Sequence, residues 1–145
     1  MSIPDFLTRF SNGQTFTTTE VSDNVNQHPT DAERDQFYAG DKLIKIWPTV
    51  AFTGIDSGLT VEFRFDTAAS LASGSQLVIA KSRIFTQAEL GIITNVWFLA
   101  IPANRLPSGY DWSGVFYVPE NQAATAGAIS AALVRGAERA NVRVA

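Results

Sequence analysis

The clearest pattern in the chain is the strict alternation of apolar and polar residues in the stretch GLTVEFRFD, residues 58–66. The apolar positions are Val61, Phe63 and Phe65, and the positions between them are polar. A period of two in β-favouring residues is typical of a strand with one face in the core and the other in water. We therefore expect a half-buried strand here.

Short apolar or alternating runs along the rest of the chain predict further strands. One covers residues 42–52 and is bent at Pro48, which has no amide hydrogen and so indicates a bulge or a sheet edge. Clear runs also cover residues 76–82, 96–102 and 112–118, and weaker ones cover residues 5–11 and 14–21. With one more strand near the C-terminus the count is about eight, which predicts an all-β sandwich or barrel.

The stretch ENQAATAGAISAALVRGAERA, residues 120–140, carries two conflicting signals. Its many alanines favour a helix, whereas Ile129, Ala131 and Leu133 alternate with their neighbours at the period of a strand. Pro119 ends the preceding strand, and the polar residues after it suggest a hairpin-like return. We therefore predict that residues 128–135 form the last strand and that residues 136–145 form a C-terminal tail.

Helix signals are few and short. Thr30 with Glu33, and Thr86 with Glu89, have the spacing of a capping box, in which each side chain bonds the other residue's amide. Gly91 is placed to end the second of these turns. We expect one or two single-turn helices within loops.

A chain of 145 residues is long enough for one domain, so we expect residues 1–145 to form a single unit. It contains no cysteine, which excludes disulfides, a thiolate nucleophile and a cysteine zinc site. The N-terminal MSIPDFLTRF has neither the basic nor the long apolar region of a secretory signal. No run reaches the roughly 20 apolar residues of a membrane helix, so we expect no membrane partner.

The formal charge of −3, without any cluster of lysine and arginine, argues against a nucleic-acid partner because binding phosphates requires a basic face. Only 17% of the residues are charged, against about 25% in typical domains. A threonine-rich β surface is the simpler explanation. The alternative is that other subunits cover much of the surface, since interface cores are depleted in charge.

No arrangement of polar residues predicts catalysis. The single histidine, His28, lies in a loop with proline beside it and without a nucleophile motif elsewhere. Glu62 and Asp66 share one face of their strand about 13 Å apart, too far for a glycosidase pair, and suit a solvated ion ladder with Arg64. We expect no catalytic residue, no metal site and no cofactor, and hence no enzyme.

The aromatic residues are the remaining lead. The tryptophans at 47, 97 and 112 and the tyrosines at 110 and 117 could form a sugar-binding platform or a subunit interface, although core packing explains most of them. Residues 112–118 carry large side chains on both faces. A second sheet or a neighbouring subunit should therefore cover that strand.

The order of these segments resembles the small capsid cementing, or decoration, proteins of tailed phages, of the Bordetella-phage type. The resemblance extends over residues 6–134 and is strongest in FRFDTAASLASGSQLVIAKS and YVPENQAATAGAISAALV. It rests on a pattern of segments and not on a catalytic motif. The connection NQHPTDAERDQFY, which is long and acidic, and the extension RGAERANVRVA depart from the family pattern.

The resemblance implies a jelly-roll β-sandwich that forms a homotrimer on the outside of the capsid and binds the major capsid protein. Such a protein is made in the host cytoplasm, is located on the virion and has no enzymatic activity. As apolar candidates for an interface we take Phe6, Phe10, Trp47 and Trp97. The alternative function is a carbohydrate-binding β-sandwich module of a virion, which the aromatic residues suggest.

Overall fold

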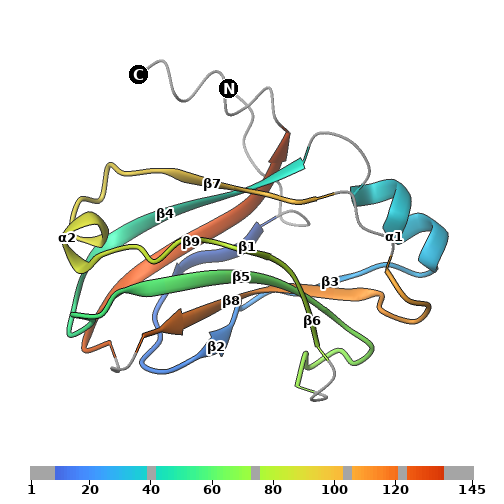
Figure 1. Cartoon of the computed structure of the whole chain (residues 1–145), viewed down its shortest axis with the longest axis horizontal. Coiled ribbons are helices and arrows are strands. Elements are labelled where there is room, and N and C mark those ends of the chain that lie inside the picture. The colour runs from blue at the N-terminus through green and yellow to red at the C-terminus, as the bar shows by residue number, and fades with distance from the viewer. Residues whose placement is uncertain (1–8, 39–41, 73–75, 103–105, 121–123, 136–145) are drawn as a thin grey trace.

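A computed structural model describes residues 9–38, 42–72, 76–102, 106–120 and 124–135. Within them the chain forms two antiparallel sheets stacked face to face, with a helix at each end of the sandwich (Figure 1). The first sheet has the strand order β1-β9-β4-β7, and the second has the order β2-β8-β5-β6, with β3 also pairing with β8.

The first sheet contains β1 (Arg9–Gln14), β9 (Ala126–Arg135), β4 (Lys42–Thr53) and β7 (Trp97–Ala100). The second contains β2 (Glu20–Val21), β3 (Asn26–Gln27), β8 (Trp112–Pro119), β5 (Leu59–Asp66) and β6 (Leu77–Lys81). Because β2 and β3 pair with successive parts of β8, they together fill one strand position. The described strands thus occupy eight positions, as predicted.

The strand pairing is nested. β1 pairs with β9, β2 and β3 pair with β8, β4 pairs with β7, and β5 pairs with β6. A long antiparallel ribbon folded in this way over two sheets is a jelly roll. The predicted all-β jelly-roll sandwich is therefore confirmed. The expected hairpin after Pro119 is wrong, because β8 and β9 belong to different sheets.

The main core lies between the two sheets. Phe10 of the first sheet meets Phe63 of the second edge to face, with ring centroids 5.8 Å apart, and both side chains are fully buried. Phe16, in the loop between β1 and β2, stacks on Tyr117 at 5.3 Å. Alternate residues of the long strands supply the rest of the core, including Ile44, Ile46, Val61, Phe65, Val115, Ile129 and Leu133.

The outer face of the second sheet is also largely covered over β5 and β8, which corrects the prediction for β5. Thr60, Glu62 and Asp66 were expected to be solvated, but all three are buried. On the neighbouring β8, the side chain of Leu71 approaches to 3.0 Å from where a Cβ would stand at Gly114. The loop after β5 thus returns over the outer face of β8 at Gly114, the residue that pairs with Arg64 of β5.

The two-sided burial expected for residues 112–118 is confirmed, since β8 is buried along most of its length. The first sheet covers the inner face of β8. Val21 and Val25 join Leu71 around Gly114 on the outer face. The chain itself therefore supplies this cover, without a neighbouring subunit.

The two helices differ from each other in length. α2 (Gln87–Leu90) is the predicted single turn, and both halves of the capping box between Thr86 and Glu89 are formed. α1 (Asp31–Tyr38) has eight residues and so exceeds the single turn expected. The Thr30 hydroxyl accepts from the amide of Glu33 at 3.1 Å, as the sequence predicts.

Of the two conflicting signals in residues 120–140, the strand signal is correct. β9 runs between β1 and β4 in the middle of the first sheet, so its backbone is paired on both sides. Ala128, Ser130 and Ala132 are almost fully buried, which fits their small size.

The predicted bulge at Pro48 coincides with a register shift between β4 and β9. The predicted tail, 136–145, lies outside the described residues.

Candidate functional site

The most exposed large apolar residues include Ile84, Ile92 and Ile93, which lie just before and just after α2. We call them the isoleucine surface. Their exposed fractions are 53%, 53% and 55%, whereas Ile44, Ile46 and Ile129 in the core strands are fully buried. A group of large apolar side chains in water marks a surface that gains free energy when a partner covers it.

The backbone beneath the isoleucine surface is well anchored. Leu90 of α2 is fully buried, and the amide of Ile55 donates to Gln87 Oε1 at 2.9 Å. Asn95 donates to the carbonyl of Glu89 at 2.9 Å and holds the turn that carries Ile92. The surface is thus presented by a fixed element, which reduces the ordering entropy that binding would cost.

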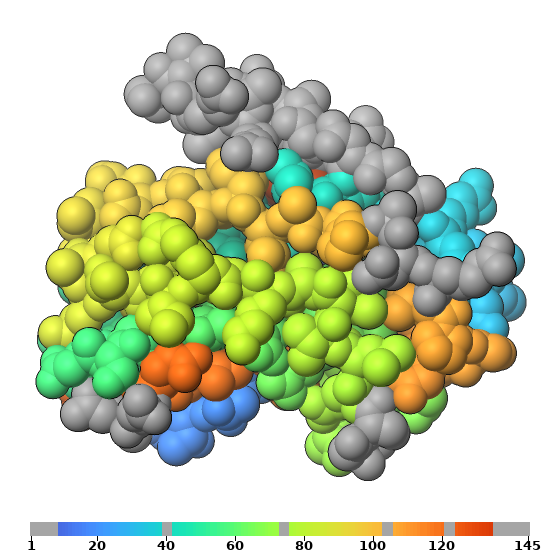
Figure 2. Space-filling model, in the orientation of Figure 1, coloured from blue at the N-terminus to red at the C-terminus, as the bar shows by residue number. Residues whose placement is uncertain are grey.

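The isoleucine surface has no net charge of its own. Residues 90–104 contain no charged side chain. Beside them Arg83 and Glu89 form an ion pair of 2.6 Å, so their charges compensate each other. The hydrogen bond from Arg83 lowers the pKa of Glu89 to about 2, with a further contribution from the amide of Thr86. Figure 2 shows the segment from β6 through α2 to β7, yellow-green to amber, across much of one side of the molecule.

The strand β7 continues this uncharged segment. Within the described residues it pairs only with β4, so its other edge has no β partner. Trp97 stacks on Phe85 with ring centroids 4.4 Å apart and is partly buried. Natural sheets commonly protect such edges with charges or proline, and β7 contains neither.

The interface candidates from the sequence do not form one group. Phe6 lies outside the described residues. Phe10 was expected at an interface but is fully buried in the core, where its ring faces Phe63. Trp97 pairs in register with Ile46, whose side chain faces the core, whereas Trp47 is the next residue along β4. Trp47 and Trp97 therefore face opposite sides of the first sheet.

Trp47 is half-exposed and carries the ammonium group of Lys45 over its ring, 4.8 Å from the centroid. This is a cation–π contact on the outer face of the first sheet.

Sequence reasoning selected Trp47 and Trp97 by their size but missed the three isoleucines. Ile92 and Ile93 lie in the uncharged run of residues 90–104, between the turn ended by Gly91 and the strand predicted at residues 96–102, whereas Ile84 lies beside Arg83 and gives no such signal.

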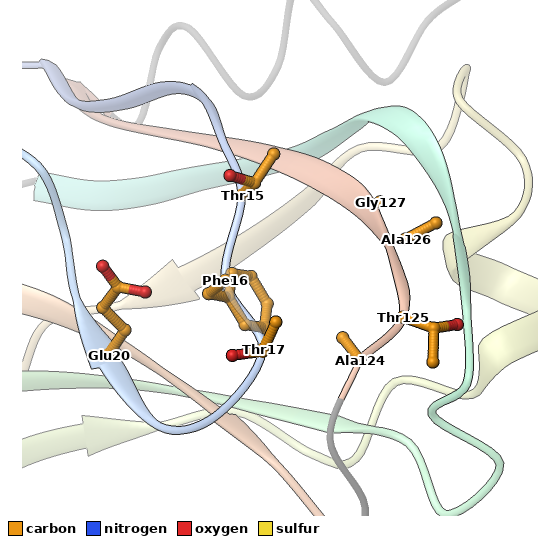
Figure 3. Close-up of a pocket in the computed structure, with 8 residues that line it drawn as sticks. All are labelled: Thr15, Phe16, Thr17, Glu20, Ala124, Thr125, Ala126 and Gly127. Carbon is orange, nitrogen blue, oxygen red and sulfur yellow. The ribbon is translucent and has the colours of Figure 1, made fainter.

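A shallow hollow of about 370 Å³ lies between residues 15–20 and 124–127 (Figure 3). Its polar lining residues are Thr15, Thr17, Glu20 and Thr125, and the Thr125 hydroxyl is already paired with that of Thr53 at 3.0 Å. Phe16 also lines it but is 6% exposed because it stacks on Tyr117. The hollow offers hydrogen bonds to a polar ligand and little aromatic surface.

The polar residues weighed for chemistry are occupied by structural contacts. The guanidinium of Arg64 donates to Glu62 at 2.8 Å and lies 4.0 Å over the ring of Phe116. The predicted ion pair of Glu62 with Arg64 is thus present, but Glu62 is buried and Arg64 is only partly exposed. His28 packs against Phe37 and Tyr38, with centroid distances of 4.9 Å and 5.2 Å.

Arg34 is the polar residue that sequence reasoning missed most clearly. It is 1% exposed and donates to the carbonyls of Leu106, Pro107 and Tyr110, at 3.0–3.3 Å. It also forms ion pairs with Asp31, Asp35 and Asp111, at 2.9–3.4 Å. An arginine on a short acidic helix gives no local sign that a loop 70 residues later will enclose it.

Within the described ranges, no group of three or more histidine or carboxylate side chains is placed to hold a metal ion. No helix there is long and apolar enough to cross a membrane. The chain matches no known protein-family model, and no curated protein matches it in sequence.

Proposed function

We propose that this protein is a structural cementing protein of a tailed-phage capsid. It binds the outside of the shell as a homotrimer and stabilises the contacts between major capsid proteins. The observation that carries the proposal is the agreement between segment order and topology. The segments that resemble the Bordetella-phage decoration proteins fold into the jelly roll that this resemblance implies.

The energetics of such a role require no catalytic chemistry. A protein that binds the assembled shell, but not its separated subunits, stabilises the shell by its binding free energy. Many copies on one lattice act together, so each contact can be weak. Fixed, neutral surfaces suit this task better than a deep polar pocket.

We assign the contact between subunits of the trimer to the isoleucine surface. The chain has a net charge of −3, so copies repel each other wherever charged surfaces meet. The surface of Ile84, Ile92 and Ile93 adjoins the uncharged residues 90–104 and a compensated ion pair. It can therefore face a second copy without like-charge repulsion, while burying apolar side chains.

Light scattering on the purified protein tests the oligomeric part. The wild type is expected to have three times the monomer mass of 15.7 kDa at micromolar concentration. The double variant Ile92→Asn/Ile93→Asn should be monomeric. Val50→Asn is the matched control, because Val50 is 54% exposed but lies in β4. A monomeric wild type would contradict the proposed trimer. A double variant that is still trimeric would show that the subunit interface does not include Ile92 and Ile93.

Deleting the gene from the parent phage tests the role itself. Particles without the protein should lose infectivity at a lower temperature, or at a lower chelator concentration, than complete particles. Expression of the protein in trans should restore the resistance. Equal resistance with and without the protein would refute the cementing role, whatever the oligomeric state.

A carbohydrate-binding module of a virion is the second candidate function. The hollow between residues 15–20 and 124–127 favours it, because threonine hydroxyls and the Glu20 carboxylate can bond sugar hydroxyls. A glycan array should then give signals that Glu20→Ala removes. An array without signal would eliminate this function and leave the cementing role unaffected.

A further inference from the structure

The environment of His28 is unusual for the only histidine of the chain. Its side chain is more than nine-tenths buried, and Nε2 has no hydrogen-bond partner among the described residues. The ring contacts the rings of Phe37 and Tyr38, which belong to α1 and also contact each other. Its backbone amide donates to the carbonyl of Asp111 at 2.9 Å.

This histidine lies at the joint between α1 and the sandwich. The hydroxyl of Tyr38 is 2.6 Å from Ser113 Oγ of β8, and the Tyr38 ring contacts Phe63 and Phe65 in the core. On the other side, Arg34 ties α1 to the carbonyls of residues 106–110. We call this set of contacts the α1 clasp. His28 forms the part of it that can change its charge near neutral pH.

Among the residues that the structure describes, the charged groups around His28 come from three elements. α1 contributes Arg34, Asp31 and Asp35, the loop before β8 contributes Asp111, and β4 contributes Lys42. The ammonium of Lys42 lies over the ring of Phe37, 5.2 Å from its centroid, on which His28 packs. The three carboxylates bind Arg34, and Asp31 also accepts from Ser108 and Gly109.

We propose that His28 is an acid-sensitive wedge, and that protonation of its imidazole releases α1 from the end of the sandwich while both sheets stay folded. A charged imidazole would lie in a buried apolar setting beside the buried guanidinium of Arg34. Unbonded Nε2 would then carry a proton with no acceptor, which is costly away from water. Release of α1 gives this cation access to solvent.

The direction of the pH effect follows from the same contacts. Burial, and then the charge of Arg34, lowers the pKa of His28 below its ordinary value of 6.5. A group whose folded pKa is lowered in this way favours the clasped state above pH 6.5. That contribution is lost as the pH falls from 6.5 towards the folded pKa, by about tenfold in the clasp equilibrium per pH unit.

Two measurements on the full-length protein test the wedge. The ring protons of His28 give one NMR titration curve, because the chain has no other histidine. Hydrogen exchange at pH 7, 6 and 5, expressed as protection factors, follows α1 and the strands β5, β8 and β9 separately. We expect His28 to titrate below 6.5, with α1 losing protection about tenfold per unit in that window and the strands unchanged.

The matched variants are His28→Phe, which keeps an aromatic ring without a titrating group, and His28→Gln, which keeps a polar side chain. In both, α1 should keep the same protection from pH 7 to pH 5. Loss of protection in the variants too would assign the effect to the carboxylates around Arg34 and overturn the proposal. Equal loss in α1 and the strands would overturn local release.

The NMR titration of His28 in the wild type tests the proposal even if both variants fail to fold. A His28 pKa at or above 6.5 means that the fold does not disfavour the imidazolium, and the wedge is then refuted. This result leaves the capsid role intact, since the trimer assay and the deletion of the gene do not depend on His28.

Discussion

The ring of Phe52 occupies the space in which a side chain at position 127 would begin. A Cβ built on Gly127 would lie 2.8 Å from Cδ1 of Phe52, and closer still to Cγ and Cδ2. Gly127 also has a φ of 128°, a conformation that residues with a Cβ rarely adopt. Gly127→Ala is therefore expected to lower the free energy of unfolding by about 3–5 kcal/mol, from overpacking and backbone strain together.

Gly109→Ala separates the two effects. Gly109 also has a positive φ, of 89°, but its nearest neighbour would be 3.9 Å from a new Cβ. Only the strain remains, so we expect a loss of about 1–2 kcal/mol. Urea denaturation of both variants measures the difference. Equal losses would show that the contact with Phe52 relaxes at little cost.

Leu71 is a loop residue that should behave as a core residue. It is 1% exposed and covers Gly114 on the outer face of the second sheet. We expect Leu71→Ala to cost about 2–4 kcal/mol of unfolding free energy, because it leaves a cavity over β8. Val78→Ala, at a position 48% exposed in the same sheet, should cost well under 1 kcal/mol. Similar losses for both variants would mean that the loop does not cover the sheet.

Arg34 should be more important to stability than any other charged residue of α1. Arg34→Met removes its ion pairs with three aspartates and its bonds to three carbonyls, and we expect a loss of about 3–5 kcal/mol. Arg34→Lys keeps the charge but cannot reach all the acceptors, so its loss should be smaller. Glu33→Gln, on the exposed side of α1, is the control and should change stability by less than about 0.5 kcal/mol. Thermal and urea unfolding measure all three.

The ion pair between Arg83 and Glu89 predicts a local pH effect. The folded pKa of Glu89, about 2, is below its ordinary value of 4.5. The ion pair and the cap therefore stabilise the fold fully above pH 4.5, and this contribution is lost as the pH falls towards 2. Arg83→Gln should raise the Glu89 pKa towards 4.5, and so should molar salt in the wild type. NMR titration of the Glu89 carboxylate measures this pKa in the wild type and in the variant. An unchanged pKa in the variant would show that Arg83 is not the main cause of its lowering.

The sequence determined the local structure because the signals for it are local. Alternation in β5, the capping box of α2 and the paired faces of β8 each depend on residues a few positions apart. The strand, the capping box and the two-sided burial of β8 are confirmed, whereas the polar face of β5, expected in water, is buried. Strand content and turn chemistry together narrowed the fold to a sandwich or barrel, and the resemblance named the jelly roll.

Tertiary contacts decided which residues are buried by segments that are distant in the sequence. Leu71 returns over the outer face of the second sheet at Gly114, and the carbonyls of residues 106–110 enclose Arg34. Phe10 belongs to the core because Phe63 faces it from the other sheet. Ile92 and Ile93, in contrast, are exposed because their turn lies at one end of the sandwich, where none of the described strands covers them. Burial depends on which segments pack against each other in the fold. A periodic sequence pattern identifies the apolar face of a strand or helix, but it does not show which other segment will cover either face.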